Sequence, residues 1–452
     1  MNKIYENYNV LRWLEKLLNE KLGNKWLLEF KDKKLILNLV NEEGSIIFDN
    51  LVFNNTFNNK YLPCSDWNSK LEGFSPPIED LIPAPGLSKP PKKLIEKNEN
   101  NYFIHYDIMG LMYFMLTRIE EVNSTEYDQF DRYPSYCSHA FKFNYLDRPI
   151  VDEWVLILKQ VIKKKWPQIK LKEKEFSINL SHDVDRPFQY LNLSLFNILR
   201  FLKKIFKNIF SRKFENLIKN IKDFIDVQKG HLDKDPYNTF DWIMNISEKN
   251  GLKSRFNFIS INKNKYYDSD YAIESKSIID LLNEINKRNH YIGLHPNFES
   301  YLDAVSIKKQ FEILKKVLKK EDIIQNNLSS RMHYLRYKHP KTSILLSEAG
   351  ILIDESMCYA DYAGFRCGSC FEYPAFDPIS LKEINLRIRP LIVMDVTITG
   401  YMGIDGSENI IKKILDLKNK CKKVKGVFSM LWHNSELVTD NQKKIYNSVI
   451  KN

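Results

Sequence analysis

The stretch Ile178-Asn-Leu-Ser-His-Asp-Val-Asp185 decides the fold and the site that we predict for this chain. Its apolar first half is typical of a buried β-strand, and the strand ends in a histidine and two aspartates. In α/β barrels, the carboxyl ends of the strands present the catalytic side chains. The alternative is an Asx-rich turn that caps a following helix. Stretches further along the chain favour the catalytic interpretation.

The composition is that of a large globular protein with a basic balance. The chain has 452 residues, 43% of them hydrophobic, with 24 Tyr, 27 Phe and a net charge of +11. This length predicts two domains, or one large domain with an appendage. The basic residues are spread out and accompany no recognition motif, so we expect no nucleic-acid partner. Six cysteines are few for this length, and only one pair is closely spaced, which argues against a disulfide framework.

The first residues indicate a cytoplasmic location. Residues 1–23 have a charged, amphipathic helical pattern without an apolar core segment. Such a pattern is neither a secretory signal nor a membrane span. We therefore expect a cytoplasmic protein.

Residues 1–170 are predicted to form a small α+β domain. Helical patterns are mixed there with short alternating runs that are typical of strands. Helices are expected at 10–21, 106–121 and 151–166, and strands at 34–40 and 45–48. The proline-rich segment 75–91 is expected to be a connector or an irregular surface loop. The acidic pair Glu120 and Glu121 is interpreted as a solvated helix end.

Residues 175–445 are predicted to form a larger α/β domain, with a helical insertion at about 186–250. Strands are expected at 176–181, 255–261, 291–294, 351–353, 391–396 and 427–432. Helical patterns lie between several of them, at 277–288, 306–319 and 410–422. Strands and helices that alternate at this spacing imply a mostly parallel sheet, and over this length a (βα) barrel or a distorted version of one.

Four more stretches place a histidine, an arginine or an acid where a predicted strand stops. They are Gly293-Leu-His-Pro-Asn-Phe-Glu299, Arg331-Met-His-Tyr-Leu-Arg336, Gly364-Phe-Arg-Cys-Gly-Ser-Cys370 and Leu431-Trp-His-Asn434. A single histidine at a strand end is more often structural than a ligand. Several histidines that converge on one barrel mouth with two aspartates predict a divalent metal site. Nitrogen ligands favour zinc, with cobalt, manganese and iron as alternatives.

The order of these motifs resembles the polysaccharide deacetylase family, the NodB-homology carbohydrate esterases, whose fold is a distorted (βα) barrel. The resemblance lies in Ser181-His-Asp-Val-Asp185, Gly293-Leu-His-Pro, Arg331 and Leu431-Trp-His433, and it covers about residues 175–440. Roughly the first 150 residues resemble the uncharacterised domain of unknown function that precedes a subgroup of these proteins.

The resemblance implies a role for each matching residue. Asp183 corresponds to the base aspartate, and Asp185 to a metal ligand. Arg331 corresponds to the arginine that orients the base. His433 corresponds to the late histidine that protonates the leaving amine.

The second family motif is incomplete in this chain. The family has His-x-x-x-His, in which both histidines bind the metal. His295 matches the first, but Glu299 stands in place of the second. Glu299 could serve as an oxygen ligand, or His333 or His182 could take over, or the chain holds no catalytic metal.

The implied activity is amide hydrolysis on an N-acetylated carbohydrate, lipid-linked forms included, during assembly of a surface polysaccharide. A divalent metal, zinc first, would activate water, with Asp183 as base and His433 as acid. Arg336, Arg366 and Trp432 are the predicted substrate-binding residues, since a guanidinium can clamp an anionic group and an aromatic ring can stack on a sugar. The alternative is a glycan-binding or scaffolding protein that kept the barrel and lost catalysis.

The predicted insertion contains a strongly apolar helix with a lysine-bearing face, at residues 193–210. It has two interpretations. It packs on the barrel with a solvated basic side, or it anchors the protein peripherally on the inner face of the membrane, where lysines 203, 204 and 207 would contact anionic lipid.

Overall fold

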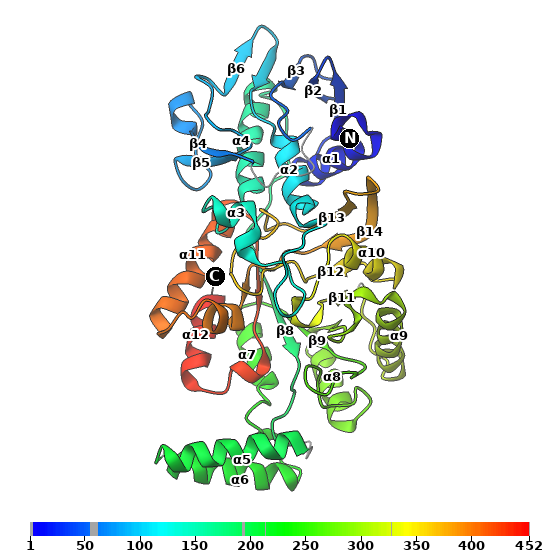
Figure 1. The fold of residues 1–452 in the computed structure, drawn as a ribbon, viewed down its shortest axis with the longest axis vertical. Coiled ribbons are helices and arrows are strands. Elements are labelled where there is room, and N and C mark those ends of the chain that lie inside the picture. The colour runs from blue at the N-terminus through cyan, green and yellow to red at the C-terminus, as the bar shows by residue number, and fades with distance from the viewer. Residues whose placement is uncertain (1–2, 55–61, 192–194, 213, 327, 452) are drawn as a thin grey trace. The chain divides into compact units, whose positions relative to one another are not determined.

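The computed structural model describes residues 3–54, 62–191, 195–212, 214–326 and 328–451 (Figure 1). The chain forms two compact units. Unit 1 comprises Met1–Ser177, Tyr334–Val393 and Leu415–Ser429, and unit 2 comprises Ile178–His333, Met394–Ile414 and Met430–Asn452. The domain ranges 1–170 and 175–445 stay a prediction.

The amino-terminal part of unit 1 contains a mixed five-stranded sheet, in the order β1-β2-β3-β7-β6. Its strands are β1 (Trp26–Lys31), β2 (Lys34–Leu39), β3 (Ser45–Phe48), β6 (Ile95–Asn98) and β7 (Asn101–Ile104). Only the pairing of β3 with β7 is parallel among those described here. The helices of this part are α1 (Tyr8–Leu22), α2 (Ile108–Leu116), α3 (His139–Lys142) and α4 (Ile150–Lys165).

The sequence explains where these helices begin and which face they bury. Asn7 caps α1, because its side-chain oxygen accepts hydrogen bonds from the backbone N–H groups of Asn9 and Val10. Apolar residues then recur at helical spacing, and Val10, Trp13 and Leu17 are all buried. Helix α2 is apolar on every side and is buried along its whole length, as expected for a helix inside a core.

The proline-rich segment is more ordered than we predicted. Strand β5 (Leu81–Pro85) pairs antiparallel with β4 (Cys64–Asn68) in a separate two-stranded sheet. A two-stranded sheet has only edges, where proline is tolerated because the missing N–H need not join a ladder. The carbonyl of Pro83 also accepts a hydrogen bond from the Trp154 indole, 2.8 Å away. The prediction of an irregular loop was therefore wrong for this strand.

The acidic pair after α2 was also misjudged. Glu121 is buried and accepts hydrogen bonds from both Arg118 and Arg366. Glu120 pairs with Arg118 as well. A buried carboxylate needs such partners, so this is a charged network in the interior of unit 1 and not a solvated helix end.

The larger sheet has nine strands in the order β13-β14-β12-β11-β10-β9-β8-β16-β15. The strands are β8 (Ser177–Val184), β9 (Ser254–Phe258), β10 (Tyr291–Leu294), β11 (Ser329–Ser330), β12 (Ile353–Asp354), β13 (Tyr373–Asp377), β14 (Lys382–Ile388), β15 (Val393–Met394) and β16 (Val427–Leu431). The pairs β8–β9, β9–β10, β10–β11 and β12–β14 are parallel, and β13–β14 is antiparallel. The predicted α/β class with a mostly parallel sheet is confirmed.

Helices connect these strands, as parallel pairing requires. The connecting helices are α7 (Phe240–Lys249), α8 (Lys276–Lys287), α9 (Ala304–Lys320), α10 (Lys341–Glu348) and α11 (Ser407–Lys423), and α12 (Asp440–Ile450) follows the last strand, β16. Thus α8 connects β9 to β10, and α9 connects β10 to β11. These two crossovers place β9, β10 and β11 side by side, with their carboxyl ends at one edge of the sheet.

Between β8 and α7 lies a helical hairpin, α5 (Leu195–Phe210) and α6 (Phe214–Gln228). The predicted apolar helix corresponds to α5, while residues 193 and 194 fall outside the described residues. Among the helices that the structure describes, none combines the length and the hydropathy of a membrane span.

Candidate metal centre and active site

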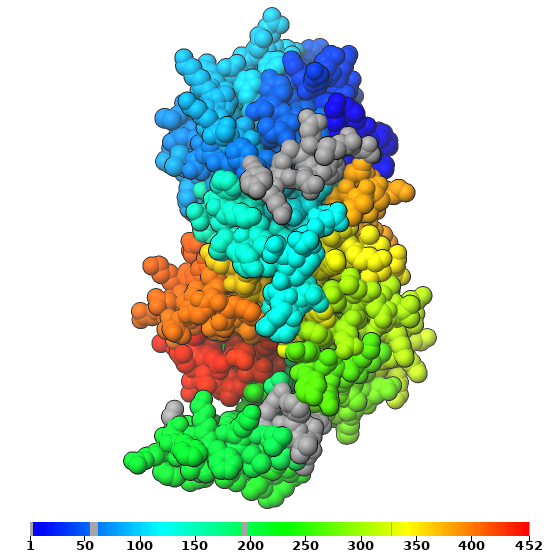
Figure 2. All heavy atoms as spheres, in the orientation of Figure 1, coloured from blue at the N-terminus to red at the C-terminus, as the bar shows by residue number. Residues whose placement is uncertain are grey.

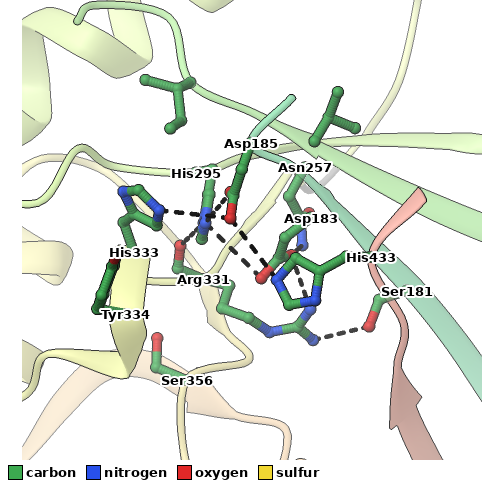
Figure 3. Close-up of polar contacts among 12 residues, drawn as sticks. Ser181, Asp183, Asp185, Asn257, His295, Arg331, His333, Tyr334, Ser356 and His433 are labelled. Carbon is green, nitrogen blue, oxygen red and sulfur yellow. Dashed lines mark hydrogen bonds and ion pairs between the residues drawn. The ribbon is translucent and has the colours of Figure 1, made fainter. Parts of the chain in front are cut away.

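Three side chains in unit 2 form a candidate metal centre (Figure 3). Asp185, His295 and His333 each offer one ligand atom, and these atoms all lie within 4.8 Å of one another. His295 Nε2 lies 3.3 Å from Asp185 Oδ1, and His333 Nε2 lies 3.5 Å from Asp185 Oδ2. Both imidazoles are buried, whereas the Asp185 side chain is 29% exposed. The centre therefore has one side open to solvent.

The sheet explains why these residues meet. Asp185 directly follows β8, His295 directly follows β10, and His333 lies three residues after β11. Backbone bonds extend the strand pairing into the loops, because the N–H of His295 donates to the Phe258 carbonyl and the N–H of His333 donates to the Pro296 carbonyl. The carboxyl ends of neighbouring parallel strands thus bring the three ligands together.

Hydrogen bonds on the far side of each imidazole fix its orientation. His295 Nδ1 lies 2.5 Å from the Arg331 carbonyl, and His333 Nδ1 lies 3.4 Å from Asp268 Oδ1. Asp268 is itself held by the backbone N–H groups of Phe298 and Asn264, at 2.8 and 2.7 Å. Such outer partners aim the Nε2 atoms of metal-binding histidines at the ion.

The donor set fits a divalent cation. Two imidazole nitrogens and one carboxylate oxygen are ligands of catalytic zinc, which keeps its fourth position for water or substrate. Asp185 Oδ1 is buried and accepts no hydrogen bond from the described residues. A bound cation would satisfy this oxygen.

The charges of the side chains at the centre also favour a bound cation. Burial alone would raise the pKa of Asp185, but His333 and His295 outweigh burial and hold it well below its usual value. Burial alone would lower the pKa of His333, but Asp185 and Asp268 raise it to about 9. Without a metal, a protonated His333 supplies the positive charge that an ion would bring.

Asp183 lies beside the centre and accepts hydrogen bonds from two polar side chains. Its Oδ1 accepts hydrogen bonds from Asn257 Nδ2 at 2.8 Å and Arg331 Nη1 at 2.9 Å. Arg331 Nη2 in turn donates to Ser181 Oγ at 2.8 Å. Asp183 Oδ2 lies 3.7 Å from His295 Nε2, on the side of the metal ligands. Burial would raise the pKa of Asp183, but Arg331 and the neighbouring imidazoles lower it, so the carboxylate is ionised.

His433 approaches the same centre from β16. Its Nδ1 lies 2.9 Å from Asp395 Oδ1, and its backbone N–H donates to Asp395 Oδ2 at 2.7 Å. This pairing directs Nε2 toward Asp185, whose Oδ2 lies 3.7 Å away. Burial would lower the pKa of His433, but Asp395 and the two site aspartates raise it to about 10. The imidazole is therefore protonated at neutral pH.

Two of the alternative ligands lie elsewhere. Glu299 accepts a hydrogen bond from Asn264 at 3.1 Å and pairs with Lys263 at 3.3 Å. His182 is neighbour to Asp183 on β8, and its side chain therefore points to the opposite face of the sheet, where Nε2 lies 3.1 Å from Ser254 Oγ. Of the predicted ligands, His333 belongs to the cluster, and Glu299, whose metal role we correct, does not.

The three predicted substrate-binding residues are engaged in structural contacts. Arg366 is buried in unit 1, where it donates to both oxygens of Glu121. Arg336, also in unit 1, donates to the Phe130 carbonyl and pairs with Asp131. Trp432 is 3% exposed, and its indole donates to the Glu436 carbonyl. A ring so deeply buried has no free face for a sugar, and both sides of the Arg366 fork are taken by Glu121, so we correct these two assignments, while that of Arg336 stays a prediction.

The sequence did not single out Asn257, Asp268 and Asp395. Asp395 is the one polar residue of the predicted strand 391–396, a signal that could have identified it, whereas Asn257 shares the predicted strand 255–261 with Arg255 and Ser260. Asp268 lies in a loop among several other polar residues, where its role depends on tertiary contacts.

Comparisons with known proteins give different matches for different parts of the chain. Residues 10–167 match a family of unknown function (DUF7033). This match confirms the predicted amino-terminal region of unknown function. No curated protein matches the sequence of the chain.

Solved structures show similarity over the larger part of the chain. A protein from Mycobacterium smegmatis that is assigned as a polysaccharide deacetylase shares 13% identity, with 62% of this chain and 84% of that chain covered and a TM-score of 0.38. The Xyl-CE4 domain of a multidomain xylanase from the hindgut metagenome of Trinervitermes trinervoides shares 11% identity, with coverages of 62% and 82% and a TM-score of 0.29. Puue allantoinase shares 9% identity, with coverages of 61% and 83% and a TM-score of 0.39. At these scores the similarity is distant, so the function is inferred from the side chains of the site.

Proposed function

We propose that this protein is a metal-dependent hydrolase that removes the acetyl group from an N-acetylated carbohydrate. The observation that carries the proposal is the arrangement around Asp185, His295 and His333. A carboxylate held by Arg331 lies beside these ligands, and an imidazolium held by Asp395 lies beside the same Asp185. A proposed base, a proposed acid and three candidate metal ligands thus lie close together in unit 2.

The three ligands would hold one divalent ion, with zinc favoured by the two nitrogen donors. When bound, such an ion polarises the scissile carbonyl and lowers the pKa of water near it. The outer contacts from Asp268 and from the Arg331 carbonyl keep both imidazoles aimed at that ion.

Asp183 is the proposed general base. Its Oδ1 is occupied by Asn257 and Arg331, which leaves Oδ2 on the side of the metal ligands to accept a proton. Arg331 keeps the Asp183 carboxylate ionised. The bond from Arg331 to Ser181 holds the guanidinium in place, and the guanidinium in turn holds the carboxylate. A base that is already ionised and oriented needs no reorganisation before it accepts the proton from water.

His433 is the proposed general acid. Its Nδ1 is bonded to Asp395, so the proton on Nε2 is the one that faces the centre. Donation of this proton to the nitrogen of the scissile amide allows the amine to leave. Asp395 then stabilises the positive ring before the transfer and holds the neutral ring in place after it.

An N-acetylated sugar is the substrate class that the motif order favours, and lipid-linked acetamido sugars belong to it. Use in surface polysaccharide assembly is part of the same proposal. The alternative of an inactive glycan-binding protein rested on Glu299 standing where the family has a histidine. The position of His333 beside Asp185 removes that reason.

Acetate release tests the proposal. The purified protein is loaded with zinc, cobalt or manganese and is incubated with N-acetylated oligosaccharides and with lipid-linked acetamido sugars. We expect release of acetate, and Asp183→Asn should slow it about a hundredfold to ten-thousandfold while metal content stays unchanged. Binding of these sugars by the loaded parent without release of acetate from any of them would favour the binding-protein alternative.

A further inference from the structure

We propose that the α5–α6 hairpin is a docking surface for an anionic lipid bilayer. The proposal does not depend on the hydrolase activity. It begins from the number of large apolar side chains that this hairpin exposes. On α5 the exposed fractions run from 38% to 85%, for Ile198, Leu199, Leu202, Phe206, Ile209 and Phe210. On α6 they run from 40% to 67%, for Phe214, Ile218, Ile221 and Ile225.

These side chains form one stripe on each helix. At 3.6 residues per turn, the six positions of α5 fall within about 120° of arc, and the four positions of α6 fall within a narrower one. A stripe of this width is what a helix normally buries against a core or a membrane. Here both stripes are exposed along helices of 16 and 15 residues, so each is about 22–24 Å long.

The two stripes lie on the same face of the hairpin. The helices form an antiparallel hairpin and contact each other along their length (Figure 1), at the lower end of the space-filling view (Figure 2). They meet through Phe201 and Phe224, whose rings are stacked with centroids 4.5 Å apart. On each helix, the stripe is rotated about the helix axis away from the Phe201–Phe224 contact. The angle is similar on both helices, and the direction is the same when each is viewed from its amino end. In an antiparallel pair, equal rotations of this kind bring both stripes to one side.

The opposite face of the hairpin is already covered. Tyr190, which follows β8, packs edge-on against both Phe201 and Phe224, with centroids 5.6 and 5.7 Å away. Lys204 donates to the Tyr190 hydroxyl at 3.1 Å, and Gln228 donates to the Tyr190 carbonyl at 2.6 Å. The hairpin is therefore attached to the rest of unit 2 through one face, and its apolar stripes are on the other.

The charges beside the stripes favour anionic lipid. Helix α5 has three lysines at 203, 204 and 207 and contains no Asp or Glu. Lys203 and Lys207 are exposed and follow the edge of the stripe, whereas Lys204 faces Tyr190, which corrects its predicted lipid contact. The acids of α6, Glu215, Asp223 and Asp226, line one hollow beside Ile218 of the stripe, where Lys219 and Lys222 accompany them.

A second copy of the chain fits this surface less well. Two copies that met through their stripes would bring two α5 helices, each without acidic residues, into one interface, where like charges repel. An anionic bilayer offers an apolar interior for the stripe and phosphate groups for Lys203 and Lys207. An amphipathic helix with these features lies in the plane of the interface, with its apolar face at the boundary between head groups and acyl chains.

The test is flotation of the full-length protein with vesicles. We expect it to float with phosphatidylglycerol–phosphatidylcholine vesicles at low salt, and to float less at high salt or with pure phosphatidylcholine. Lys203→Gln/Lys207→Gln should weaken binding about thirtyfold, because each lysine near an anionic surface contributes about a factor of five. Leu202→Gln/Phe206→Gln/Ile218→Gln should weaken it by more than about a hundredfold.

The control is Leu71→Gln/Val305→Gln/Ile324→Gln, which removes three apolar side chains elsewhere that are 79% to 86% exposed, and it should float like the parent. Light scattering on the same samples reports self-association, and circular dichroism confirms that each variant is folded. The proposal is wrong if the parent does not float with anionic vesicles at low salt, or if the stripe variant floats as the parent does. A parent that dimerises through the stripe and stays with the lipid-free fraction would assign the surface to a second copy.

Discussion

His333 Nε2 lies 3.5 Å from Asp185 Oδ2, and this pair completes a ligand set that the sequence left open. The family motif places its second histidine four residues after the first, on the same loop. In this chain that position holds Glu299, and the imidazole comes instead from the loop after the neighbouring strand, β11. The loop after a neighbouring parallel strand can supply the missing ligand, because the carboxyl ends of adjacent strands meet at the same edge of the sheet.

The first prediction concerns Arg331, the main counter-charge of Asp183. Arg331→Met would leave a buried carboxylate without its ion pair, so the free energy of unfolding should fall by about 3–5 kcal/mol. Urea denaturation measures this loss. The control is Arg12→Met, which breaks an ion pair between an exposed guanidinium and Glu15 and should cost far less, because solvent screens such a pair. Equal losses for the two variants would contradict the assigned role of Arg331.

The second prediction concerns Asp395 as a positioning residue. Burial lowers the pKa of His433, and Asp395 is the largest influence that raises it. Asp395→Asn should therefore lower this pKa, so that the activity decreases at a lower pH on the alkaline side of the profile. We expect kcat to fall about a hundredfold or more with little change in KM, because the acid and not the substrate contact is affected.

Asp395→Glu provides the rescue. It retains the charge and should restore the alkaline limb toward that of the parent. An alkaline limb at the same pH in the parent and in Asp395→Asn would show that His433 is not the acid, or that Asp395 does not control it.

The third prediction concerns the pH dependence of metal uptake. His333 must be neutral to bind a metal, but in the metal-free protein its pKa is raised to about 9. Binding should therefore release a proton, and apparent affinity should rise by up to about tenfold per pH unit below that pKa. Calorimetric titration in buffers of different ionisation enthalpy measures the released proton. An affinity that does not change between about pH 6 and pH 8 would contradict the assignment.

Much of the fold could be predicted because its signals are local. Residues 45–48 and 291–294 are strands at the predicted bounds, and the helices expected at 277–288 and 306–319 are displaced by one or two residues at most. The hairpin β13–β14 was missed. Its first strand is continuously buried and short, so it lacks the alternation that marks a strand. Strand order and pairing depend on contacts between distant residues and were not accessible from local patterns.

The site was predictable where one residue carries the signal. Asp183, Asp185, His295, Arg331 and His433 could be selected because each lies at a strand end and matches a motif in order. Asp268 could not, since its role depends on a loop that folds back to His333. The substrate roles predicted for Arg366 and Trp432 were wrong because the sequence does not show what a side chain contacts. An arginine or a tryptophan near a predicted site looks the same in the sequence whether it faces a substrate or a buried partner.

Metal content tests the central claim most directly. The parent protein, His333→Ala and Glu299→Ala are each dialysed against zinc, and bound metal is measured by atomic emission. We expect about one zinc per parent chain and per Glu299→Ala chain, and a loss of affinity above about a hundredfold for His333→Ala, since even an outer partner of a metal ligand accounts for ten- to a hundredfold. No zinc, cobalt or manganese in the parent, or loss of metal in Glu299→Ala with retention in His333→Ala, would contradict the account.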